Sequence, residues 1–459
     1  MNEGTSAHVR DTDAFTLRME RDPLLRSTIV ALAVFDRSPV WDHLVDRLER
    51  ATRLVPSFRS RLVPSPLHLA PPRWVLDPDF DLIWHLRRME CAPHQTVDEV
   101  VARAQVAATT AFDPARPLWR FTLFDGLADG RSALLMKVHH ALTDGIGGIE
   151  LAAHVVDLTR EPHDLGPLPP TPPLSRHSLG TDLTEAAGFV ARRWGGMAAS
   201  MAGSLPGQLA RTARTPMGVL TDTAATFGSV ARFVEPVTST MSPVMTARSL
   251  RRHFARLDLD LDRLRSAAAT HEATLNDAFV AGVAGGLRRY HQRHHAEIDT
   301  LRLTLPISLR EEGEPVGGNR VTLARILLPI GIADPVERMA SIGATVRATR
   351  KEPALRHSEA IASALNLLPA GVTGRMLKQV DLVATNVPGF LEPVYVGGAL
   401  VEAFYPFAPT IGTAANIGLL SYRHTGHVGA AIDAAAVVDP EVFVGCLVEG
   451  FDEVAASTP

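Results

Sequence analysis

The chain has 459 residues, 46% of them hydrophobic and 21% charged, which is the balance of a folded globular protein too long for one ordinary core. The net charge of −4 comes from 46 basic and 50 acidic residues, so there is no basic excess to indicate a nucleic-acid partner. Two cysteines, Cys91 and Cys446, can form neither a disulfide scaffold nor a four-cysteine zinc site, and we expect a reduced, cytoplasmic compartment. The first residues lack the apolar core of a signal peptide, and no apolar run is long enough to predict a membrane span.

The first predicted domain covers residues 1–160, where short strand-like runs alternate with helix-like ones. Residues 29–35 predict a strand, and the apolar spacing over 40–48 predicts a helix directly after it. The other predicted elements of this part are a helix over 97–104 and two strands, 121–124 and 133–140, joined by a turn at 126–130. This alternation is typical of an α/β domain.

Residues 161–245 have a different composition and are assigned to a crossover between two domains. Six prolines between residues 162 and 173 are typical of a linker. Beyond them, apolar residues at helical spacing form a stripe from Leu183 to Leu205. Two interpretations of this stripe stay open: a helix packed on the body of the protein, or a face that contacts a membrane or lipid surface.

An α/β pattern resumes at residue 246 and continues to residue 459. Thr274 and Asp277 fit a capping box ahead of a helix that extends through Tyr290. The remaining predicted elements are a strand over 301–307, a helix over 336–346, a hairpin with strands 416–422 and 427–434 around Thr425-Gly426, and a last helix with Asp439 at its N-cap and Pro440 at its first position.

A pair of histidines carries the strongest chemical signal. An apolar strand ends at His139 and His140, and a glycine-rich turn containing Asp144 then opens a helix. Neighbouring side chains on a strand point to opposite faces, so the two histidines cannot do the same job. A neutral imidazole, with an ordinary pKa of about 6.5, can take a proton from a hydroxyl or amine at neutral pH.

The residues alone leave a catalytic, a structural and a metal-binding role open for this pair. A metal site needs three or four converging ligands, and no fourth ligand is evident beside His139, His140 and Asp144. No Gly-x-Ser-x-Gly elbow lies in a suitable strand and helix context, which argues against a serine hydrolase. A second group, His291, His294 and His295, lies among arginines at the polar end of a predicted helix, and we interpret it as a solvated face rather than a metal site.

The segment His139-His140-x-x-x-Asp144-Gly145 resembles the HHxxxDG motif of the CoA-dependent acyltransferase superfamily. Other short motifs resemble the bacterial wax ester synthase/diacylglycerol acyltransferase family, and they occur in family order along almost the whole chain. These motifs are Asp13-Ala14-Phe15, Pro117-Leu118-Trp119, Asn276-Asp277, Gly318-Asn319-Arg320 and Thr385-Asn386-Val387-Pro388-Gly389. Two positions depart from the family pattern: Thr385, where serine is common, and Phe390, where proline is frequent.

The resemblance implies an α/β fold of two chloramphenicol-acetyltransferase-like domains, each a mixed sheet with flanking helices, and a channel at their interface. It implies that His140 is the general base, which deprotonates an acceptor hydroxyl that attacks an acyl-CoA thioester directly, without an acyl-enzyme. His139 supports the site, and Gly145 supplies backbone geometry. Asp144 pairs with an arginine, for which Arg59 and Arg61 are the candidates.

The other motif residues have less defined roles. Asn276 is expected either to donate a hydrogen bond to the substrate or the developing oxyanion, or to cap a helix together with Asp277. Trp119 is expected to shape the channel from behind, and Asn386 to lie in a turn near the domain interface.

The function that the resemblance implies is transfer of a long-chain acyl group from acyl-CoA to diacylglycerol or a fatty alcohol. Acyl-CoA enters as a substrate, and no bound cofactor or metal is implied. We expect a cytoplasmic protein that binds its apolar acceptor at the surface of a membrane or lipid droplet. Two alternatives stay open: a specialised acyltransferase or condensation-type enzyme for a secondary metabolite or a carrier-bound acyl group, and a non-catalytic lipid-surface protein.

Overall fold

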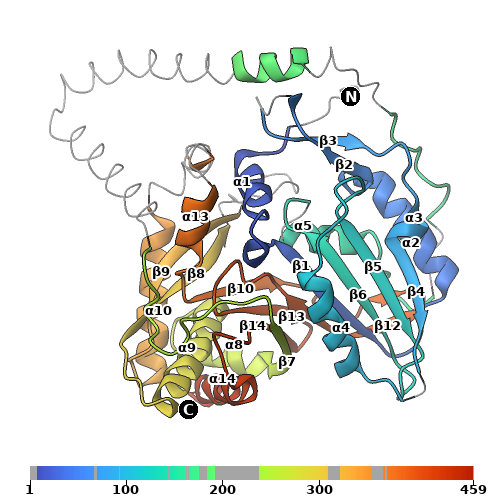
Figure 1. Cartoon of the computed structure of the whole chain (residues 1–459). Helices are drawn as coiled ribbons and strands as arrows, with labels where there is room; N and C mark the ends of the chain where they lie inside the picture. The colour runs from blue at the N-terminus through green and yellow to red at the C-terminus, as the bar shows by residue number, and fades with distance from the viewer. Residues whose placement is uncertain are drawn as a thin grey trace, which may run out of the picture.

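The computed structural model contains two six-stranded sheets with helices packed on them (Figure 1). It describes residues 8–66, 70–92, 94–142, 145–161, 163, 165–174, 183–191, 237–308, 321–352, 365–366 and 370–457.

The first sheet has the strand order β11-β12-β1-β6-β5-β4, and only the β4–β5 pair is parallel. Its strands are β1 (Thr28–Phe35), β4 (Leu86–Glu90), β5 (Trp119–Asp125), β6 (Ser132–His139), β11 (Tyr395–Val396) and β12 (Ala399–Phe407). Helix α4 (Val97–Thr109) packs its valines against the even-numbered residues of β1, such as Leu32. Helix α2 (Trp41–Leu54) packs on the side of β1 that carries Phe35. The unbroken apolar run of β1, from Ile29 to Phe35, is therefore explained by burial on both faces.

The second sheet has the strand order β7-β14-β13-β10-β8-β9, with β10 parallel to both of its neighbours. Its strands are β7 (Arg252–Asp260), β8 (Thr300–Ser308), β9 (Val321–Pro329), β10 (Leu382–Pro388), β13 (Ala415–Tyr422) and β14 (Thr425–Asp433). The helices that accompany it are α8 (Leu261–Thr270), α9 (Leu275–Arg293), α10 (Pro335–Arg350) and α14 (Pro440–Ala455). Helix α9 is buried along most of its length between this sheet and α14, where it forms the centre of the largest core.

The remaining helices and strands are shorter or lie at the periphery of the sheets. They are α1 (Asp11–Met19), α3 (Leu82–His85), α5 (Gly145–Ala153), α13 (Ala370–Leu377), the 3₁₀ turns η1 (Pro23–Leu25) and η2 (Pro56–Arg59), and a two-stranded sheet of β2 (Ser60–Val63) and β3 (Arg73–Leu76). Residues 183–191 are also helical. Within the described residues, no helix combines the length and apolar character that crossing a bilayer requires.

The two sheets are joined through β12, which comes late in the chain but belongs to the first sheet. It pairs antiparallel with β1 in a register that places Val30 opposite Phe407. At the junction the backbone of β12 passes very close to β14, since a Cβ atom on Gly429 would lie 2.0 Å from the carbonyl oxygen of Pro406. Only glycine leaves room for so close a backbone approach. The predicted division at residue 246 therefore does not account for 395–407, which complete the sheet of the first domain.

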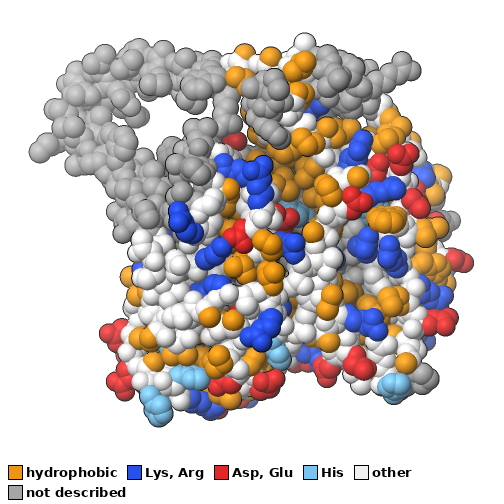
Figure 2. All heavy atoms as spheres, viewed as in Figure 1, with side chains coloured by type: hydrophobic (Ala, Val, Ile, Leu, Met, Phe, Trp, Pro, Cys, Tyr) orange, Lys and Arg blue, Asp and Glu red, His pale blue; other side chains and the backbone are white. Residues whose placement is uncertain are grey.

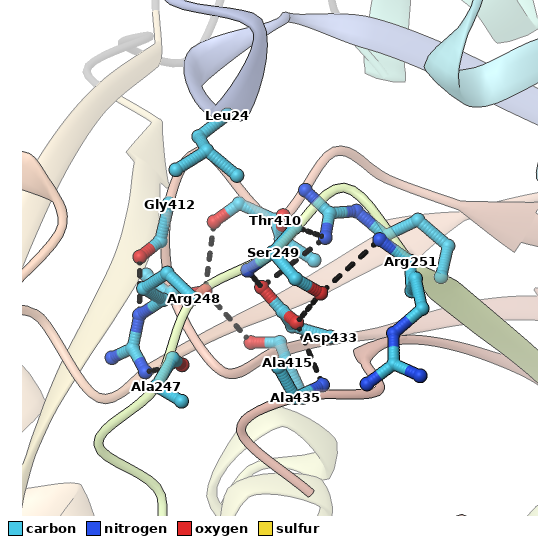
Figure 3. Close-up of polar contacts among 12 residues, drawn as sticks. Leu24, Ala247, Arg248, Ser249, Arg251, Thr410, Gly412, Ala415, Asp433 and Ala435 are labelled. Atoms are coloured by element: carbon cyan, nitrogen blue, oxygen red, sulfur yellow. Dashed lines mark hydrogen bonds and ion pairs between the residues drawn. The ribbon is translucent and has the colours of Figure 1, made fainter.

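Polar contacts around Asp433, at the end of β14, hold the segment that precedes β7 (Figure 3). The buried Asp433 carboxylate accepts hydrogen bonds from the Ser249 backbone N–H and from Ser249 Oγ, at 2.6 and 2.7 Å. Beside it, Arg248 Nε donates to the carbonyl of Gly412 at 2.6 Å. The Arg248 contact ties this segment to the loop between β12 and β13, whose residues 408, 409 and 411 line the cavity described below.

Most of the elements predicted in the first half are confirmed, namely β1, α2, α4, β5 and β6. In the second half the capping box of α9 is present, with Thr274 and Asp277 bonded reciprocally. The hairpin is confirmed as β13 and β14, but the prediction of its turn is wrong. Thr425 already pairs with Tyr422, so the turn is Arg423-His424, with Arg423 in the left-handed region at φ 56°.

The last helix, α14, begins at Pro440 as predicted, with Asp439 at its N-cap. The Asp439 side chain makes no capping hydrogen bond, however, because its carboxylate instead accepts one from the Tyr290 hydroxyl at 2.6 Å.

Candidate active site

A cavity of about 390 Å³ lies between the two sheets, in the size range of small-molecule sites. Strands β1, β6 and β12 contribute its wall from the first sheet, β10 and β13 from the second, and helices α1 and α5 complete it. Most of the lining is apolar. Hydrophobic side chains also gather on the surface between α1 and α5 (Figure 2).

His140 follows the end of strand β6 and lines this cavity. Leu134, Met136 and Val138 line the cavity from the same face of the strand, and His140 continues that alternation just past its end. The backbone N–H of His140 donates to the carbonyl of Ser27 at 2.9 Å. The end of β6 is thus held next to the start of β1, with the His140 imidazole among the cavity residues.

His139 points to the other face of the strand and is almost completely buried. Its Nδ1 accepts a hydrogen bond from the Ala141 backbone N–H at 3.0 Å, and its Nε2 lies 3.0 Å from Glu20 Oε1. The edge of the Phe112 ring packs against it. The two histidines therefore occupy opposite faces, as predicted from the strand geometry, and only His140 lines the cavity.

The glycine-rich turn is described in part. Gly145 begins α5, and Gly148, Ile149 and Leu151 of that helix line the cavity. Asp144 lies outside the described residues, as does Asn319. Of the two arginines predicted as partners of Asp144, Arg59 is an ion-pair partner of Glu49 at 2.5 Å.

The second sheet contributes polar side chains to the cavity through β10 and β13. Thr385 and Asn386 line it from β10, so Asn386 lies in the same cavity as His140, although in a strand rather than the predicted turn. Asn416 lines it from β13, and its Nδ2 donates to the carbonyl of Pro409 at 2.8 Å.

Asn276 and Asp277 lie at the start of α9 and are not part of the cavity lining formed by the described residues. The buried Asp277 carboxylate accepts hydrogen bonds from the backbone N–H and the hydroxyl of Thr274, at 3.0 and 2.8 Å. Of the two roles left open for this pair, the contacts of Asp277 are those of a helix cap.

Trp119 is a core residue behind the cavity wall. Its Nε1–H donates to the carbonyl of Phe58 at 2.7 Å, and its ring packs on Phe121. Phe58 and Phe121 both line the cavity, whereas Trp119 does not. Trp119 therefore packs behind two of the lining residues, and its role in shaping the channel stays a prediction.

Two buried basic groups lie near the site but outside the cavity lining. Burial lowers the pKa of His85 to about 4, so this imidazole is neutral at physiological pH. Burial also lowers the pKa of Lys137, on the same face of β6 as His139, to about 8, and the charges of Arg120 and Arg26 act in the same direction. The Lys137 ammonium donates to the carbonyl of Thr110 at 2.7 Å.

The prediction of a solvated histidine cluster is wrong for His291. This side chain is buried on α9, with Nδ1 2.9 Å from the Leu287 carbonyl and Nε2 2.8 Å from Ser242 Oγ. His295 is exposed, as expected. Across the described ranges, no group of three or more potential metal-ligating side chains is placed to hold a metal ion.

Sequence reasoning missed Glu20, Ser27 and Asn416. Glu20 and Ser27 flank η1, and their roles follow from contacts with residues more than a hundred positions away. Asn416 had a weak signal, since it is the single amide in a largely apolar strand, β13.

Comparison with known proteins assigns the family. Residues 10–279 match the model of the wax ester synthase/diacylglycerol acyltransferase catalytic domain, and residues 317–455 match that of the C-terminal domain of the same family. A proposed diacylglycerol O-acyltransferase of Mycobacterium tuberculosis is 37% identical over 454 residues, covering 96% of this chain and 90% of that protein.

Solved structures share the fold. The wax ester synthase/diacylglycerol acyltransferase of Marinobacter aquaeolei VT8 aligns with a TM-score of 0.63 and 22% identity over 98% of both chains. The first condensation domain of the calcium-dependent antibiotic synthetase also aligns with a TM-score of 0.63, at 16% identity, over 99% of this chain and 96% of that domain. The chain belongs to the wax ester synthase/diacylglycerol acyltransferase family of acyltransferases.

Proposed function

We propose that the protein transfers a long-chain acyl group from acyl-CoA to the hydroxyl of diacylglycerol or a fatty alcohol, forming triacylglycerol or wax ester. The observation that carries this proposal is a largely apolar cavity of about 390 Å³ with the His140 imidazole in its wall. An apolar wall favours acyl chains, because each Å² of apolar surface removed from water contributes about 25 cal/mol. The imidazole beside those chains supplies a general base.

In the proposed reaction, the His140 imidazole takes the proton of the acceptor hydroxyl while the oxygen attacks the thioester carbonyl carbon. A C–O bond forms, the C–S bond of the tetrahedral intermediate breaks, and the imidazolium returns the proton to the leaving CoA thiolate. A thioester is already activated, so the step needs no acyl-enzyme. Thr385 and Asn386 are the lining side chains on the facing sheet that could bind the polar part of either substrate.

The substrate class is tested with labelled palmitoyl-CoA and the purified full chain, offering diacylglycerol and a long-chain alcohol in parallel. Lipid chromatography should show triacylglycerol, wax ester or both, and mass spectrometry of the protein during turnover should show no acyl adduct. A folded protein that forms neither ester would contradict the proposal. Transfer to a carrier-bound or specialised acceptor would then favour the alternative of a specialised or condensation-type enzyme. Lipid binding without any acyl transfer would favour the alternative of a non-catalytic lipid-surface protein.

We also propose that the protein collects its acceptor at the surface of a membrane or lipid droplet. The described start of the apolar stripe supports this, since Leu183 is exposed on the helix of residues 183–191. Glu185 of this helix forms an ion pair with Arg73, and Phe189 packs on His8, so the helix is attached to the rest of the protein. Leu183→Glu should then reduce flotation of the protein with phospholipid vesicles. Leu391→Glu, which changes an exposed leucine elsewhere, is the matched control. Equal flotation of both variants would contradict this role for the stripe.

A further inference from the structure

Glu20 connects helix α1 to the strand end that carries His140. It is the C-cap residue of α1, and its carboxylate is partly buried between two elements of the site. Oε1 accepts a hydrogen bond from the Ser27 backbone N–H at 2.8 Å and lies 3.0 Å from His139 Nε2. The Ser27 carbonyl in turn accepts the His140 backbone N–H at 2.9 Å.

We propose that Glu20 is a positioning residue for the acyl transfer, which fixes the backbone around His140 through Ser27 and the His139 imidazole. The proposal rests on the proposed function, in which His140 is the base. Glu20 does not line the cavity, so it acts through its two neighbours rather than on the substrate.

The hydrogen bonds of His139 determine which of its nitrogens carries the proton. Nδ1 accepts the Ala141 N–H, so this nitrogen is unprotonated and the proton of the neutral ring is on Nε2, facing Glu20. The His139 backbone is held as well, because its N–H donates to Leu118 and its carbonyl accepts from Leu142, each at 2.9 Å. The residues on both sides of His140 are thereby anchored, and Glu20 is the group that orients the buried ring.

The charges around Glu20 keep its carboxyl group ionised, so that it accepts from the Ser27 N–H and interacts electrostatically with the His139 ring. Burial alone would raise the pKa of the Glu20 carboxyl, but the contacts with His139 and Ser27 and the charge of Arg26 hold it below its usual value. Lys137 is a second cation close enough to interact with Glu20 electrostatically. The carboxylate is therefore ionised at physiological pH.

The same residue ends the helix that forms one wall of the cavity. Phe15, Thr16 and Met19 of α1 line the cavity, and Glu20 follows directly. Anchoring Glu20 to the end of β6 therefore places this wall and the base in a fixed relation, which is the kind of supporting contact that an active site needs for exact geometry.

The kinetic test compares Glu20→Ala and Glu20→Gln with the parent in the palmitoyl-CoA assay. Displacing a catalytic group by about 1 Å can cost about 100-fold, so we expect kcat of Glu20→Ala to fall by about 10- to 100-fold with KM for palmitoyl-CoA nearly unchanged. Gln keeps an oxygen that can accept from Ser27 and His139, so Glu20→Gln should recover most of kcat. Glu297→Ala removes an exposed carboxylate remote from the site and serves as the control.

Two further results separate positioning from a general loss of structure. Glu20→Ala combined with His139→Ala should be no slower than His139→Ala alone, because both changes break the same connection. In the parent labelled with ¹⁵N-histidine, the His139 Nε2–H signal is assigned by its absence in His139→Gln. This proton should exchange slowly with solvent in the parent. Glu20→Ala should lose that protection while remaining folded.

An unchanged kcat in folded Glu20→Ala, or an unchanged protected Nε2–H signal, would overturn the proposal. The spectroscopic measurement does not depend on turnover. A parent without acyl transfer activity would therefore contradict the proposed function, while the His139 signal would still decide the role of Glu20.

Discussion

His85 shows how a single buried side chain makes the stability of this protein depend on pH. The imidazole stacks on Phe80 and Trp119 and donates from Nδ1 to the Trp119 carbonyl at 2.8 Å. Its pKa is lowered to about 4 by burial, whereas in the unfolded chain it has the ordinary value. The unfolded state therefore takes up a proton between about pH 6.5 and pH 4 that the folded state does not, so stability is lost as pH falls through this window.

The expected loss from His85 is about 3 kcal/mol over the whole window, at about 1.4 kcal/mol per pH unit. His85→Phe removes this titration, so the stability advantage of the parent over the variant should shrink between pH 7 and pH 4.5. Urea unfolding at the two pH values measures it, with the exposed His43→Gln as the control. A difference in unfolding free energy between the parent and His85→Phe that does not vary with pH would contradict the lowered pKa of His85.

Among individual residues, those placed by local geometry could be predicted and those placed by distant contacts could not. The opposite orientation of His139 and His140 follows from the alternation of a strand and needs no knowledge of the fold. The burial of His291 depends on Ser242, which lies 49 positions earlier and reaches it only through the tertiary structure. Glu20 was missed for the same reason.

At the scale of elements, the contact between α9 and α14 depends on glycine. A Cβ atom on Gly450 of α14 would lie 2.3 Å from the carbonyl oxygen of Gly282 on α9, whereas one on Gly445 of the same helix would meet nothing within 4 Å. Gly450→Ala should force the helices apart and cost about 1–3 kcal/mol. Gly445→Ala should be neutral or stabilise by up to about 1 kcal/mol, since alanine is the better helix former.

Thermal unfolding of the two variants checks this prediction, because they make the same chemical change in one helix. A lower Tm for Gly450→Ala than for Gly445→Ala is expected. Equal Tm values would show that the helices can separate without cost.

The type and approximate position of helices and strands were predictable, because apolar spacing and capping residues are local signals. The turn of the hairpin was nevertheless misplaced by two residues.

At the scale of the whole molecule, the two halves of the chain are expected to fold together. Strand β12 comes from the second half and pairs with β1 along most of its length, and both strands line the cavity. No local pattern records which distant strands pair, so a division of the sequence by composition could not place residues 395–407 in the first sheet. The family motifs indicated the architecture, but the crossing strand is visible only in the structure.

Cutting the chain after residue 245 should therefore leave both pieces without a stable fold. In residues 1–245 alone, β1 keeps β6 but loses β12, so the edge of a central strand is exposed together with the apolar cavity wall. Circular dichroism should show no cooperative thermal transition for this fragment. A fragment that unfolds cooperatively near the Tm of the full chain would contradict the interdependence of the two sheets.

We expect His140, in the apolar cavity, to act as the base for acyl transfer. The most direct measurement is the rate of neutral ester formation by the parent and by His140→Ala at saturating palmitoyl-CoA and preferred acceptor, with the affinity for palmitoyl-CoA measured alongside. A general base contributes about 10²- to 10⁴-fold in rate, so we expect a loss of that size in the folded variant, with palmitoyl-CoA binding retained. Ester formation at the parent rate in His140→Ala would contradict it.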